Sequence, residues 1–150
     1  MNRRLLMKKL DKPLIEDTIR EAERDTMGEI RVSVAAFFWG SVEKVAERTF
    51  VRLGMTQTRQ RNGVLIFVVP SRRRYHILCD SGIPFPEREE LTRNVSNILT
   101  EHFKKGEYST GLVKSVKETA RILRKIFPSD SNQNINELPD EIDHTRLKNA

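Results

Sequence analysis

A chain of 150 residues, 37% apolar and 32% charged, has room for one folded domain. Its single cysteine excludes an intramolecular disulfide and a cysteine zinc cluster, and its short apolar runs exclude a segment of the roughly 20 apolar residues that span a bilayer. The net charge of +6 leaves anionic partners open, although spread surface charge explains it as well.

The first third of the chain predicts a helix, a strand and a second helix. Asp11 is a suitable cap for a helix over residues 12–26, where apolar residues recur at helical spacing. Weak alternation of apolar and polar residues predicts a half-covered strand over residues 29–38. A second helix begins after Ser41 and ends at Gly54.

The middle of the chain predicts a β-hairpin. An Asn-Gly turn precedes six apolar residues, 64–69, which do not alternate and therefore predict a strand buried on both faces. A short turn at residues 70–73 then leads into a third strand, which runs antiparallel to the second and ends before Asp80.

The last part predicts two helices and a polar tail. Helical spacing of apolar residues indicates helices over 87–105 and 109–127. Residues 128–150 carry five acids and two bases, a net charge of −3, which leaves +9 on the rest of the chain. We expect this acidic tail to be largely disordered, residues 1–12 to be a flexible N-terminus, and residues 13–127 to form the domain. No signal-like apolar stretch occurs near Met1, so we expect a cytoplasmic protein.

The order of the predicted elements is αβαββαα, which indicates an α/β fold. A helix between the first two strands implies a right-handed parallel crossover, and the hairpin adds an antiparallel strand. We therefore expect a small mixed sheet with helices on both faces, a three-layer-like αβα sandwich.

Four blocks of this sequence resemble the TPM domain family, in matching order and spacing. The blocks cover residues 26–32, 53–65, 79–83 and 103–112. The resemblance implies an α/β sandwich with a central mixed sheet. It also brings in a phosphatase activity proposed for plant relatives and a divalent ion, such as calcium or magnesium, associated with some members.

Asp80 is the leading candidate for a site residue, because it ends a strand beside Gly82. Its carboxylate has the chemistry to hold a divalent ion, with Glu29 as a second ligand, or to act as a general base. The alternative is that Asp80 only caps the turn that follows it. Arg61 and Asn62 are candidate ligand-binding residues for a phosphate, although Asn-Gly is also a turn signal by itself.

Two further segments are candidates for partner contacts. Phe37, Phe38 and Trp39 form a bulky aromatic group on a polar chain, which fits either an exposed contact patch or a cover over the core. Residues 72–74, the basic patch of Arg72, Arg73 and Arg74, have the charge to meet phosphodiesters or lipid headgroups, or form a solvated turn.

Three functions follow from these features. The favoured one is a binding or accessory module for a protein or membrane-associated partner, contacted through the end of the sheet near Asp80 and the loop of Phe37–Trp39. The second is a weak phosphatase. No glycine-rich phosphate loop and no nucleophile elbow occur, so this enzyme would need a divalent metal held by Asp80 and Glu29, with Glu87 as a third candidate carboxylate. The third is binding of nucleic acid or lipid through the basic body. Substrate, partner and oligomeric state are not encoded in any motif.

Overall fold

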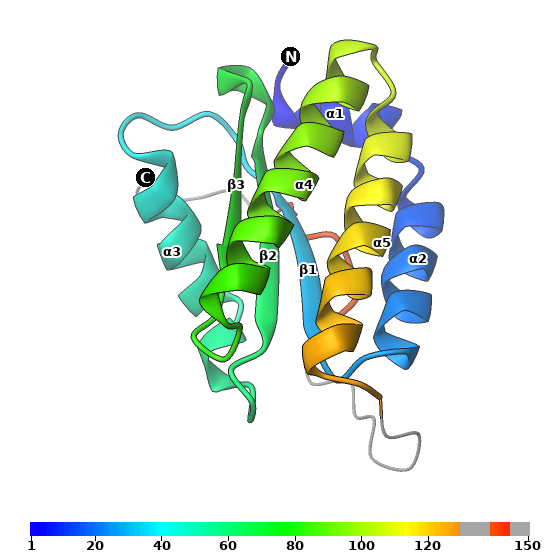
Figure 1. Ribbon diagram of the computed structural model, residues 1–150. Helices are drawn as coiled ribbons and strands as arrows, with labels where there is room; N and C mark the ends of the chain where they lie inside the picture. Colours follow the sequence, from blue (N-terminus) through cyan, green and yellow to red (C-terminus); the bar gives the residue numbers. More distant parts are fainter. Residues whose placement is uncertain (130–138, 145–150) are drawn as a thin grey trace.

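The computed structural model describes residues 1–129 and 139–144 (Figure 1). In chain order the elements are α1 (Arg3–Lys9), α2 (Lys12–Arg24), β1 (Glu29–Val34), α3 (Val42–Arg52), η1 (Met55–Gln57), β2 (Gly63–Val69), η2 (Pro70–Arg72), β3 (Arg74–Cys79), α4 (Phe85–Lys104) and α5 (Tyr108–Ile126). The predicted α/β fold and its succession of elements are confirmed, with α1 in addition.

The sheet is mixed and has the order β1-β2-β3. β1 and β2 are parallel, in a register that pairs Glu29 with Gly63 and Val34 with Val68. β2 and β3 are antiparallel, and Val64 pairs with Cys79. The parallel crossover and the hairpin therefore have the predicted directions.

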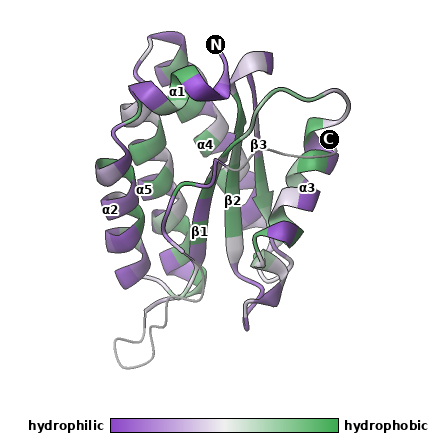
Figure 2. Cartoon of the chain, turned by 180° about the vertical axis from the view of Figure 1, so that it is seen from behind, coloured by the Kyte–Doolittle hydropathy of each residue, from purple (hydrophilic) through white to green (hydrophobic). Residues whose placement is uncertain are grey.

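Helices cover both faces of this sheet (Figure 1). α3 lies on one side, where Leu65, Phe67 and Val69 point into a core shared with Phe50. α2, α4 and α5 lie on the other side, over the residues of opposite parity such as Ile66. Every residue of β2 is buried, so the strand without alternation is indeed the central one, and Figure 2 shows it hydrophobic over most of its length.

The N-terminal residues differ from the predicted flexible segment, because Arg3–Lys9 form α1. Leu6, Met7 and Leu10 are buried in the larger core cluster. These side chains are buried only because α5 and the β2–β3 turn pack against α1. The sequence of α1 alone, in which most residues are charged, does not indicate that packing. Asn2 caps the helix by accepting a hydrogen bond from the Leu5 N–H.

Part of the predicted disordered tail has a defined position. Residues 139–144, here called the strap, run beside β1, with an isolated parallel bridge between Ser33 and Asp143. Ile142 is buried in the core. The prediction for residues 130–138 and 145–150 concerns residues outside the described part.

β1 ends at Val34, four residues before the predicted end. The Ala35 N–H still donates to Val68 O, but β2 itself ends at Val69 and offers no further partner. Among the described residues, no helix is both long enough and apolar enough to cross a membrane.

Candidate functional site

Asp80 and Arg61 form a bidentate ion pair at one end of the sheet. Arg61 Nε and Nη2 donate to the two carboxylate oxygens of Asp80, each at 2.8 Å. The Asp80 side chain is 5% exposed and also accepts a hydrogen bond from the Ser81 N–H at 2.7 Å. Both residues were predicted as ligand-binding candidates from the sequence. In the structure they bind each other.

Asn62 lies beside this pair but is buried. Its Nδ2 donates to Met27 O at 2.7 Å, which ties the start of β2 to the turn before β1. Its Oδ1 has no hydrogen-bond partner among the residues that the structure describes, yet the side chain is only 1% exposed. A ligand reaches Asn62 only if this corner opens.

Glu29 begins β1 at the same end of the sheet and is 2% exposed. Its N–H donates to Asn62 O at 3.3 Å. Within residues 1–129 and 139–144, no three histidine, cysteine or acidic side chains are grouped so that they could hold a metal ion. The predicted metal site of Asp80 with Glu29 therefore remains a prediction without support from the geometry.

The direction of β3 explains why this end is a structural corner. Ligand sites in open α/β sheets gather at the carboxyl ends of the parallel strands. Asp80 does follow the carboxyl end of a strand, but that strand is antiparallel, so Asp80 lies at the amino ends of β1 and β2. The general rule therefore points to the opposite end, where Val34 and Val69 end their strands.

At that opposite end, the segment after β1 presents two exposed aromatic rings. Phe37 is 50% exposed and Trp39 is 80% exposed, and their rings contact edge to face at a centroid distance of 4.8 Å. Phe38 between them is 4% exposed and lies 6.3 Å from the ring of Phe67. The predicted aromatic group is thus divided: Phe38 anchors the loop in the core, while Phe37 and Trp39, here called the aromatic pair, face solvent.

The basic turn braces this loop. Arg72 Nη1 donates to Gly40 O at 2.6 Å, and the guanidinium lies over the Phe38 ring at 5.3 Å from its centroid. Arg74 forms an ion pair with Glu43 at 2.9 Å. Two of the three arginines predicted as a free basic patch therefore have partners within the protein, and only Arg73 has none among the described residues.

Sequence reasoning missed the connection between the basic turn and the aromatic loop. Arg72 and Gly40 are 32 positions apart, and no spacing rule relates them. The sequence held one weak indication of this contact. If β1 and β2 are parallel, the loop after β1 and the three arginines after β2 lie at the same end of the sheet.

Two further chemically reactive side chains, His76 and Cys79, lie on β3. Burial raises the pKa of the Cys79 thiol to about 12, so it stays protonated at neutral pH. Burial also lowers the pKa of His76, which faces Glu43 and Glu47.

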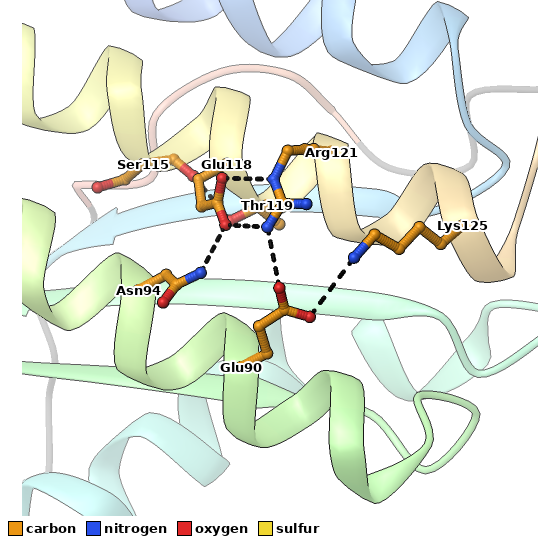
Figure 3. A network of polar contacts seen from close by, with 7 residues as sticks. All are labelled: Glu90, Asn94, Ser115, Glu118, Thr119, Arg121 and Lys125. Atoms are coloured by element: carbon orange, nitrogen blue, oxygen red, sulfur yellow. Dashed lines mark hydrogen bonds and ion pairs between the residues drawn. The ribbon is translucent and has the colours of Figure 1, made fainter.

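A polar network between α4 and α5 is structural (Figure 3). Glu118 accepts from Arg121 Nε at 2.8 Å and from Asn94 Nδ2 at 2.8 Å, and Arg121 also bonds to Glu90 at 3.0 Å. Arg121 lowers the pKa of both Glu90 and Glu118 through these hydrogen bonds. Both carboxylates, Glu90 and Glu118, are therefore paired with cationic side chains of α5.

Comparisons with known proteins agree with this fold. A model of the TPM domain matches residues 4–122. The NMR structure of BA42, from the psychrophilic bacterium Bizionia argentinensis, has a TM-score of 0.83 and 33% identity, over 89% of this chain and 92% of BA42. The N-terminal domain of a P. gingivalis protein is similar in fold, with a TM-score of 0.55 and 21% identity over 73% of this chain and 71% of that domain. The comparison with curated proteins found no match.

Proposed function

This chain belongs to the TPM domain family, as its four sequence blocks predicted, and we propose that it works as a binding module that docks a protein partner through the aromatic pair. The partner is either soluble or membrane-associated, and a cytoplasmic location remains a prediction from the sequence. The aromatic pair, at the carboxyl end of the sheet, is the single observation that carries this proposal.

Exposed aromatic rings on a braced loop have the properties of an interface centre. Tryptophan is among the residues that contribute most to binding when buried by a partner. Here the backbone around Trp39 is held from both sides, by the buried Phe38 and by the hydrogen bond from Arg72 to Gly40. Because the loop is ordered before binding, little conformational entropy is lost on association.

The two alternatives have less support. A metal-assisted phosphatase needs a free carboxylate, and the oxygens of Asp80 are matched by Arg61 and the Ser81 N–H. Binding of nucleic acid through the basic turn needs free arginines, and Arg72 and Arg74 are engaged with Gly40 and Glu43.

The test is affinity capture with the immobilised protein and an extract of its source cells, quantified by mass spectrometry. The double variant Phe37→Ala with Trp39→Ala should retain the partner at least about 30-fold less, which corresponds to the roughly 2 kcal/mol of an interface hot spot. The control is Val51→Ala with Phe85→Ala, which removes two side chains exposed by 61% and 65% elsewhere on the surface.

Equal retention by the loop variant and the control would contradict the proposal. A purified candidate partner permits a second readout, since Trp39 is the only tryptophan of the chain. Its fluorescence should shift to shorter wavelength on binding, and an unchanged spectrum in a saturated complex would place the interface elsewhere.

A further inference from the structure

A pocket lies where α1, the β2–β3 turn, α4 and α5 meet. Its volume is about 520 Å³, within the usual range of small-molecule sites. Figure 1 shows α1 beside the ends of α4 and α5 at the same end of the molecule as the β2–β3 turn. The pocket thus opens near the carboxyl end of β2, where sites in open α/β sheets are expected.

The inside of the pocket is apolar. Leu6, Val68 and Pro70 line it with buried aliphatic surface. Three aromatic rings form a wall: Phe103 contacts Tyr75 at 5.5 Å and Tyr108 at 5.1 Å between ring centroids, both edge to face. Such a wall favours an apolar ligand body over a sugar or a nucleotide phosphate chain.

Two cations line the pocket from its exposed side. Arg73 and Lys104 are both exposed, and neither has a carboxylate partner in the described part of the chain. Glu101, one turn before Lys105, pairs with Lys105 instead. Among residues 1–129 and 139–144, no acidic side chain lines the pocket, so the charge of its described lining is positive.

The backbone at Arg73 supports a role for its side chain. Arg73 has a φ of 52°, a left-handed conformation that is costly for a residue with a Cβ and is usual for glycine or asparagine in such a turn. Residues in such costly conformations cluster at ligand sites and switch regions. Burial raises the pKa of Tyr75, whose hydroxyl bonds to Thr100, so the phenol stays neutral and does not oppose an anion.

We propose that this pocket binds a small amphiphilic anion, with its apolar body against the aromatic wall and its carboxylate or phosphate between Arg73 and Lys104. The argument is independent of the aromatic pair and its partner. The apolar lining matches the hydrocarbon part of such a ligand, and the two cationic side chains match its anionic group. An uncharged or cationic amphiphile offers these cations no opposite charge.

The test is a titration of ¹⁵N-labelled protein with sodium decanoate below its micelle concentration. Amide signals of Val69, Tyr75, Phe103 and Tyr108 should shift with a single saturating curve. Decanol and decyltrimethylammonium are the uncharged and cationic controls and should bind at least about tenfold more weakly. Equal binding of decanol, or shifts spread over the whole sheet, would overturn the proposal.

Charge variants locate the anionic group. Arg73→Gln with Lys104→Gln should weaken decanoate about tenfold. The matched control, Arg93→Gln with Lys114→Gln, removes one exposed arginine and one exposed lysine that do not line the pocket, and its affinity should equal that of the wild type. Thr100→Phe should also weaken binding by filling the exposed side of the pocket without changing charge. Unchanged affinity in both pocket variants would overturn the proposal.

A last arm separates the sources of the anion. Decyl phosphate tests a phosphate head, and sedimentation with phosphatidylglycerol vesicles tests a lipid that stays in a membrane. Saturable binding of the free ligands without sedimentation indicates a free metabolite-like anion. Sedimentation that the Arg73 and Lys104 variant abolishes assigns the same pocket to a lipid headgroup.

Discussion

The Asp80 carboxylate accepts three hydrogen bonds, two from Arg61 and one from the Ser81 N–H. Gly82 completes this corner, because a Cβ at that position would lie 2.1 Å from Gln60 O. Arg61 itself adopts a left-handed φ of 50° at this corner. The Asp-Ser-Gly corner, part of one of the four blocks that resemble the TPM family, is therefore explained here by packing of one loop against another.

Glu23 is a buried carboxyl group with unusual titration. Its Oε2 accepts the Ile30 N–H at 2.9 Å, and its side chain also bonds to Asp140 of the strap. Burial is the first cause that raises its pKa, from 4.5 to about 11, and the bond to Asp140 adds to it. At neutral pH the Glu23 carboxyl group therefore holds its proton.

The titration of Glu23 predicts how stability depends on pH. Below about pH 4.5 the group is neutral in the folded and the unfolded chain; as pH rises toward about 11, only the unfolded chain ionises, so stability is lost across this window. The loss from one proton is at most about 1.4 kcal/mol per pH unit. We expect Glu23→Gln to unfold at higher urea concentration than the wild type at pH 9, with a smaller difference at pH 5.

The control for this experiment is Glu21→Gln, an exposed glutamate of the same helix. Its stability should follow the wild type at every pH. If the curves of Glu23→Gln and the wild type run parallel from pH 5 to pH 9, Glu23 does not carry the proton.

At the scale of elements, α4 and α5 pack along much of their length and are joined at the surface by Arg121 (Figure 3). The guanidinium holds Glu118 on its own helix and Glu90 on α4. Networks of exposed charges contribute less than their hydrogen bonds suggest, because solvent screens them. The packing of α4 against α5 therefore depends mainly on apolar contacts. The ion pairs of Arg121 help to fix the position of one helix along the other.

We expect Arg121→Met to lower the free energy of unfolding by about 1 kcal/mol in low salt, and by less in 1 M salt where the charges are screened. Lys117→Met, an exposed cation of the same helix without an ion pair among the described residues, should change it little. Thermal unfolding at two salt concentrations measures both. An effect of Arg121→Met that does not diminish with salt would show that packing, not charge, is lost.

At the scale of the whole molecule, the strap closes the edge of the sheet that β1 leaves open. Its Asp143 exchanges backbone hydrogen bonds with β1, accepting from the Val34 N–H at 2.9 Å and donating to Val32 O at 3.0 Å. The Asp143 carboxylate accepts from Ser33 Oγ at 2.8 Å and pairs with Arg52 at 2.9 Å. An edge strand is thereby covered by the chain itself, which protects it from pairing with other chains.

Removing the apolar anchor of the strap should expose this edge. Ile142 is 4% exposed, and Ile142→Ala should cost about 2 kcal/mol. The Val34 amide should exchange its hydrogen faster, because its acceptor belongs to the strap, while the Ile66 amide in the central strand should change less.

Glu141→Ala, a change at an exposed position of the strap, is the control and should leave the Val34 amide protected. Equal exchange at Val34 in the wild type and Ile142→Ala would mean that the strap does not depend on its buried side chain.

Most of the helices and strands, and the family, were predictable from local patterns in the sequence. Helical spacing placed α2, α3, α4 and α5 within a few residues, and the missing alternation of residues 64–69 identified the central strand, because periodicity and burial are local properties of a chain. Short blocks such as residues 79–83 indicated the family for the same reason, since each block is a local stretch of sequence.

Which candidate residues contact one another depends on the assembled fold. It paired Arg61 with Asp80, buried Asn62, divided the aromatic group around Phe38, and brought residue 143 to residue 33. These outcomes depend on contacts between residues far apart in the chain and on the direction of β3. No local sequence pattern encodes these contacts, because each one forms only when the sheet and its helices bring the two residues together.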